Sequence, residues 1–92
     1  MKPLFIPLKS EYFEAFKAGT KTVEYRKFSD RWNDRTCQPG RSVILSKGYG
    51  KGNRMTGTIV SFDMRFLDTK EWRDCYGAAG YAACIGITLN GG

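Results

Sequence analysis

The stretch SEYFEAFKAGTKTVEYRK, residues 10–27, combines a helix signal, a stop and a strand signal. Tyr12, Phe13 and Phe16 recur at the spacing of one apolar helix face. Gly19 follows where a glycine in the left-handed conformation commonly ends a helix. We therefore predict a helix over residues 10–18, with Ser10 as its N-cap.

A turn and then a strand are predicted after this helix. From residue 22 to 27, β-branched and aromatic side chains alternate with charged ones, which is the period-2 pattern of a strand. In this register Val23 and Tyr25 serve the core, whereas Glu24 and Arg26 share the opposite face.

Lys21, on the turn before this strand, adds a third charge close to Glu24 and Arg26. Two interpretations of the three residues stay open. Inside a concave pocket they form a ligand-binding or catalytic cluster, in which arginine donates to a carbonyl or phosphate and glutamate accepts from an amine or hydroxyl. On an open strand they are an ordinary solvated face whose ion pair contributes little.

Further strand and helix patterns lie on both sides of this stretch. The region 29–36 and the glycine-rich segment 48–53 are typical of loops. A bulge or bend is expected near Gly57 or Asp63. Strands are predicted at residues 4–8, 41–47, 55–66 and 82–89. A second helix, with Asp68 or Thr69 as its N-cap, is predicted to run to Tyr76, and residues 90–92 are predicted to form a short polar end. This order predicts a single α+β domain over residues 1–92, a small mixed β-barrel of about five strands with two or three short flanking helices.

Composition narrows the classes of protein and of chemistry. The chain has 92 residues, 41% of them hydrophobic, and no apolar run long enough to cross a membrane, so we expect one globular, cytoplasmic domain, monomeric by default. It has no histidine, which removes the histidine-based triads and zinc sites. Its three cysteines fit neither a disulfide framework nor a zinc motif, and Cys84 is expected to be buried. No metal and no cofactor are expected.

The net charge of +6 is unevenly distributed. Between Arg35 and Phe62 there is no acidic residue, and five basic residues occur: Arg35, Arg41, Lys47, Lys51 and Arg54. Such a segment attracts polyanions, of which nucleic acid is the most abundant, although many basic segments have no specific partner.

Aromatic residues and cysteines offer further candidates with two interpretations each. Tyr49, between Lys47, Lys51 and Arg54, is placed to stack on a base, or else belongs to a solvated loop. Trp32 and Trp72 are expected to be core or lid residues rather than stacking platforms. Cys75 and Tyr76 have no neighbouring base that would make them reactive.

The segment PLKSEYFEAFKAGTKTVEYR, residues 7–26, resembles the signature of the ASCH family. That signature is an apolar strand, a helix with aromatic residues, and then G-x-K-x-x-E-x-R, which this chain matches with Gly19, Lys21, Glu24 and Arg26. The segments PGRSVILS and GITL resemble two later strands in the sequence pattern of this family. The specific match covers about 20 residues. The resemblance implies a PUA-like fold with a cleft where the helix and the G-x-K-x-x-E-x-R strand meet.

The resemblance also implies a choice between binding and catalysis. The family is associated with RNA binding, and some members are amidohydrolases of acetylated cytidine or have been assigned nuclease activity. The amidohydrolase pattern uses a lysine, a threonine and a glutamate. Lys21 matches the lysine, Glu24 occupies the threonine position, and Glu71 is the nearest candidate for the glutamate by order. The missing threonine favours binding.

We therefore predict a small module that binds RNA, a nucleotide or a nucleoside, without a membrane partner. Lys21, Glu24 and Arg26 would line its cleft. The surface residues Arg41, Lys47, Tyr49, Lys51 and Arg54 would hold the sugar-phosphate chain. The alternative is a hydrolase of modified nucleosides or of RNA, with Lys21 and Glu24 as catalytic residues, and a third is an adaptor that binds another protein.

Overall fold

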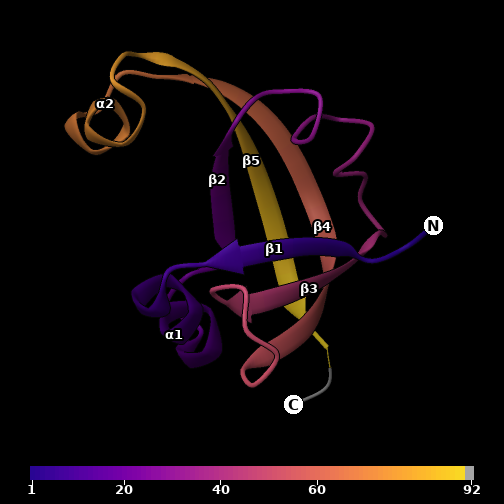
Figure 1. The fold of residues 1–92 in the computed structure, drawn as a ribbon. Coiled ribbons are helices and arrows are strands. Elements are labelled where there is room, and N and C mark those ends of the chain that lie inside the picture. The colour runs from indigo at the N-terminus through magenta and orange to yellow at the C-terminus, as the bar shows by residue number, and fades with distance from the viewer. Residues whose placement is uncertain (91–92) are drawn as a thin grey trace.

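The structure, a computed structural model, describes residues 1–90, so the last two glycines of the expected polar end lie outside it. Within these 90 residues, five strands and two helices follow one another (Figure 1). Their bounds are β1 Leu4–Leu8, α1 Ser10–Ala18, β2 Val23–Lys27, β3 Ser42–Lys47, β4 Arg54–Leu67, α2 Lys70–Tyr76 and β5 Gly80–Leu89. Each predicted element is present, with strand ends shifted by one or two residues.

The five strands form one mixed sheet in the order β1-β3-β4-β5-β2. Strands β1 and β3 are parallel, and the other neighbours are antiparallel. The predicted α+β class is confirmed. Within residues 1–90, however, β1 and β2 are the two edges of the sheet and do not pair, so the sheet is not closed into the expected barrel.

Side chains, rather than a backbone ladder, link the two edges. The Arg26 guanidinium of β2 donates to the Pro7 carbonyl of β1, and Arg31 donates to the Phe5 carbonyl at 3.4 Å. The ring of Trp32 lies 4.8 Å from the Arg26 guanidinium carbon and 5.1 Å from that of Arg31. These contacts connect β1 and β2, where a closed barrel would have a backbone ladder between strands about 4.8 Å apart.

The main core lies between α1 and the inner face of the sheet. Phe13 and Phe16 of α1 pack into one cluster with the alternate, buried residues of β1, namely Leu4, Ile6 and Leu8. A second, smaller cluster joins Trp72 of α2 to Ala82 and Cys84 of β5. Trp32 and Trp72 are thus core residues, as predicted, and the expected burial of Cys84 is confirmed.

The ends of both helices follow from local chemistry, with one correction. Gly19 ends α1 with φ of 82°, as predicted, and Thr69 caps α2 by accepting a hydrogen bond from the Trp72 amide at 3.2 Å. The prediction that Ser10 is the N-cap of α1 is wrong. The cap position is Lys9, which has no capping side chain, and Ser10 is the first helical residue because the Lys9 carbonyl already accepts the first helical hydrogen bonds.

Strand β4 carries its irregularity at a different place from the one expected. The pairing with β5 shifts between Ile59 and Ser61, not at Gly57 or Asp63. Gly57 is instead a close-approach position, because a Cβ there would lie 2.8 Å from the Thr88 carbonyl oxygen. Among residues 1–90, neither helix has the length and apolarity that crossing a bilayer requires.

Candidate functional site

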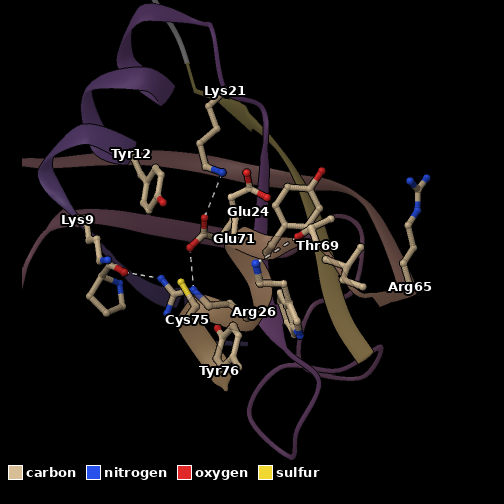
Figure 2. Close-up of a pocket in the computed structure, with 14 residues that line it drawn as sticks. Lys9, Tyr12, Lys21, Glu24, Arg26, Arg65, Thr69, Glu71, Cys75 and Tyr76 are labelled. Carbon is tan, nitrogen blue, oxygen red and sulfur yellow. Dashed lines mark hydrogen bonds and ion pairs between the residues drawn. The ribbon is translucent and has the colours of Figure 1, made fainter. Parts of the chain in front are cut away.

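A cavity of about 570 Å³ lies along the free edge of β2, with walls from both helices (Figure 2). Figure 1 shows α1 and α2 on the same side of β2, toward its opposite ends. The volume lies within the usual range for small-molecule sites. The lining residues are Pro7, Lys9, Tyr12, Lys21, Glu24, Tyr25, Arg26, Arg65, Leu67, Thr69, Glu71, Trp72, Cys75 and Tyr76.

The structure reverses the predicted burial of the two faces of β2. Glu24 is 6% exposed and lies opposite Ile85 of β5, on the face of the main core, whereas Tyr25 is 45% exposed. Val23 is partly buried and packs only against the smaller Trp72 cluster. The alternation and the core contact of Val23 were predicted correctly, but the expectations that Tyr25 is a core residue and that Glu24 lies on an outer face were wrong. Buried Glu24 is tolerated because cations neutralise it.

Lys21, Glu24 and Arg26 form one charged cluster (Figure 2). One Glu24 carboxylate oxygen lies 2.7 Å from Arg26 Nε, and the other lies 3.5 Å from Lys21 Nζ. Both cationic side chains are about one-fifth exposed. A buried carboxylate with a cation on each oxygen is a fixed arrangement, and Arg26 fixes it further through its bond to the Pro7 carbonyl.

Lys21 is the most available cation of this cluster. Its Nζ lies over the rings of Tyr12, Phe16 and Tyr25, at 5.1, 5.6 and 5.3 Å from their centroids. Electron-rich rings and a carboxylate both attract an ammonium group. The ammonium makes no other close ion pair among residues 1–90, so it retains hydrogen-bond donors for a ligand.

Helix α2 supplies the opposite wall of the cavity. Its rings of Trp72 and Tyr76 lie 4.3 Å apart at their centroids, which gives this wall an aromatic surface. Glu71, Cys75 and the cap residue Thr69 also face the cavity (Figure 2). The site therefore combines cations on the α1 and β2 side with aromatic rings and a carboxylate on the α2 side.

Arg41 and Lys47, two predicted surface contacts for RNA, are used within the fold. The Arg41 guanidinium donates to the Lys2 carbonyl at 3.0 and 3.1 Å and to the Thr36 carbonyl at 2.6 Å. Lys47 Nζ lies 2.7 Å from a Glu14 carboxylate oxygen, a hydrogen bond that lowers the pKa of Glu14. The structure does not bring either residue to the cavity.

Tyr49, Lys51 and Arg54 lie outside the cavity but close to one of its borders. Tyr49 and Lys51 are in the β3–β4 loop and Arg54 begins β4. The Tyr49 ring lies 6.3 Å from that of Phe5, and the Arg54 guanidinium carbon lies 5.3 Å from the same Phe5 ring. Tyr49 and Arg54 thus form an aromatic and basic surface with Phe5 of β1, and the exposed Lys51 lies in the same loop as Tyr49.

Several cavity residues were not among the predicted site residues. Lys9, the cap residue before α1, and Tyr12 of α1 lie within the segment 7–26 that resembles the ASCH signature, but they are not among its four matched residues. Thr69, Cys75 and Tyr76 belong to α2 and its cap, 48–55 residues after Lys21, and no local pattern indicates that this helix faces Lys21. Glu71 had been singled out only through the family resemblance.

The thiols and carboxylates of the site have limited chemistry. Cys75 is the exposed cysteine of the three, whereas burial raises the pKa of the Cys84 thiol despite the nearby Arg65. Over residues 1–90, no three acidic or cysteine side chains gather as metal ligands would.

No protein-family model and no curated protein sequence matches the chain.

Proposed function

We propose that this chain is a small ASCH-type module with a PUA-like fold, which binds one nucleoside or nucleotide unit, free or within RNA, in the cavity beside β2. The observation that carries the proposal is the convergence of Lys21, Glu24 and Arg26 on one cavity that also has an aromatic wall. The chain matches the G-x-K-x-x-E-x-R pattern at these same three positions and Gly19. The mixed five-stranded sheet with two helices is compatible with the proposed fold.

The arrangement of groups favours binding as the primary role. A base would lie between the exposed Tyr76 ring, which the buried Trp72 supports, and the rings near Lys21, because stacking on an aromatic ring is available to any base. Lys21 then donates to a ligand oxygen, and Glu71 accepts from a ligand amine. Glu24 acts mainly by positioning Lys21 and Arg26, because both of its oxygens already have partners.

A binding experiment tests this proposal. Isothermal titration of the protein with the four nucleosides, their 5′-monophosphates and N4-acetylcytidine is expected to detect at least one ligand. Lys21→Met should weaken that ligand roughly tenfold to hundredfold, because a charged hydrogen bond is lost. Lys17→Met removes the same charge from exposed α1 surface outside the cavity and should leave affinity unchanged. Absence of binding by every member of the panel would refute the proposal.

One observation favours a hydrolase as the second candidate. Lys21, Glu71 and Thr69 line the same cavity, so a lysine, a glutamate and a threonine are present even though Glu24 occupies the threonine position of the family pattern. The Thr69 hydroxyl accepts a hydrogen bond from the Trp72 amide, which leaves its own proton free to be donated. The test is conversion of N4-acetylcytidine to cytidine and acetate, and cleavage of a labelled RNA with and without divalent metal. Turnover that Glu71→Gln abolishes would favour the enzyme, and ligand binding without turnover would favour the module.

A further inference from the structure

The loop that joins β3 to β4 presents Tyr49 at a defined place on the surface. Its ring is 82% exposed and lies against Phe5, with centroids 6.3 Å apart. Three hydrogen bonds hold the loop: Gly48 amide to Leu8 carbonyl at 2.9 Å, Lys47 amide to Asn53 carbonyl at 3.0 Å, and Ser46 hydroxyl to Gly50 carbonyl at 3.2 Å. Figure 1 shows this loop beside the end of β1. An exposed ring on a tethered loop is available for stacking without further ordering.

Strand β1 connects Tyr49 with the cavity. Its burial alternates, so Leu4, Ile6 and Leu8 face the core while Phe5 and Pro7 face outward together. Pro7 is part of the cavity wall, and Phe5 carries the contact to Tyr49. Residues two apart on a strand are about 7 Å apart, a distance that one extended nucleotide can span. The cavity, Pro7, Phe5 and Tyr49 are therefore consecutive along one surface, which we call the β1 track.

The charge along the β1 track suits a polyanion. The Arg54 guanidinium lies over the Phe5 ring at 5.3 Å, and the exposed Lys51 lies in the same loop as Tyr49. The segment from Arg35 to Phe62, which contributes this loop, has no acidic residue. Stacking rings bordered by cations, without sequence-specific donors, are the usual means of holding single-stranded nucleic acid.

We propose that the ligand is a single-stranded nucleic acid, with one nucleotide in the cavity and the adjoining part of the chain running over Pro7 and Phe5 so that a second base stacks on Tyr49. This inference rests on the proposed function and adds to it the polymeric class of the ligand. Arg54 and Lys51 contact the backbone between the two bases.

The test compares each nucleoside 5′-monophosphate with the matching homotrinucleotide, by titration of the full chain. The trinucleotide should bind more tightly than the monophosphate. Tyr49→Ala should weaken the trinucleotide by roughly 5- to 150-fold and leave the monophosphate unchanged, because only the second base is lost. Tyr49→Phe keeps the ring and should keep the affinity. Arg54→Gln should reduce the dependence of trinucleotide affinity on salt.

A matched aromatic control lies at another surface. Tyr81 of β5 is also exposed, at 55%, and does not belong to the β1 track, so Tyr81→Ala should leave trinucleotide affinity unchanged. If Tyr81→Ala instead of Tyr49→Ala weakens the trinucleotide, the strand leaves the cavity in another direction and the inference is wrong. If the monophosphate binds but the trinucleotide binds no more tightly, the inference is wrong while the proposed function stands. If neither ligand binds, the proposed function itself fails.

Discussion

Replacing Arg26 by methionine measures how much the ion pair between Arg26 and buried Glu24 contributes to the free energy of unfolding. The change keeps most of the aliphatic volume but leaves the Glu24 carboxylate, 6% exposed, with Lys21 at 3.5 Å as its remaining cation. It also removes the donor to the Pro7 carbonyl, and with it one link between the two sheet edges. Losing one partner of a buried ion pair costs about 3–5 kcal/mol. Since about one-fifth of the Arg26 side chain is exposed, we expect the lower end, about 3 kcal/mol.

Urea unfolding followed by tryptophan fluorescence measures this loss, because Trp32 packs against Arg26. For a domain of this size, about 3 kcal/mol corresponds to a fall in melting temperature of roughly 12–24 °C. The double variant Glu24→Leu with Arg26→Met removes both charges and should recover much of the loss, since a buried pair can be replaced by apolar groups at little cost.

The chain contains a matched control for burial. Asp63 and Arg65 have the same two-residue strand spacing and the same 2.7 Å nitrogen–oxygen distance as Glu24 and Arg26, but they are exposed. Arg65→Met should therefore have a much smaller effect. If Arg26→Met and Arg65→Met destabilise the protein equally, Glu24 does not depend on its cations and the reasoning is refuted.

Three further predictions concern other contacts. The hydrogen bond from Lys47 lowers the pKa of Glu14, so this pair stabilises the fold above the unfolded-state pKa of Glu14, and the contribution is lost as pH falls through the folded-state pKa. In Lys47→Met, the Glu14 pKa measured by NMR should rise, and an unchanged value would contradict the pairing. Gly57→Ala should destabilise the protein by about 1–3 kcal/mol in urea unfolding, because the new Cβ meets the Thr88 carbonyl oxygen. Gly50→Ala, which places its Cβ in open space, should not destabilise it, and equal effects of the two variants would contradict the packing at Gly57. A thiol reagent should modify Cys75 first, since Cys37 and Cys84 are buried, and a fast-reacting thiol that persists in Cys75→Ser would contradict this burial.

The sequence predicted well the features that depend on local chemistry. The helix α1 and its end at Gly19 follow from apolar spacing and from the freedom of glycine at φ of 82°. The cap by Thr69 follows from its position before the helix. The set Lys21, Glu24 and Arg26 was found because three charges recur within six residues around one turn.

Features that depend on distant partners could not be predicted in this way. The inward face of β2 is decided by its pairing with β5 and by the neutralisation of Glu24, not by which of its side chains are apolar. The side-chain contacts between β1 and the segment from β2 onward involve Arg26, Arg31 and Trp32, and nothing in the sequence around Pro7 and Phe5 indicates that these residues meet β1. The α2 wall of the cavity likewise depends on how Trp72 docks on β5.

The central claim is that the cavity beside β2 is the ligand site. It is tested most directly by measuring whether a bound ligand protects the Cys75 thiol from chemical modification. Cys75 is an exposed thiol in the α2 wall, so its rate of modification reports whether that wall is covered. At a saturating concentration of the tightest nucleoside or nucleotide ligand, the account predicts slower modification of Cys75 in the native protein and in Lys17→Met. At a concentration near the native Kd, it predicts much weaker protection in Lys21→Met, because this variant should bind roughly tenfold to hundredfold more weakly. A ligand that binds the native protein and leaves the modification rate of Cys75 unchanged would contradict the account.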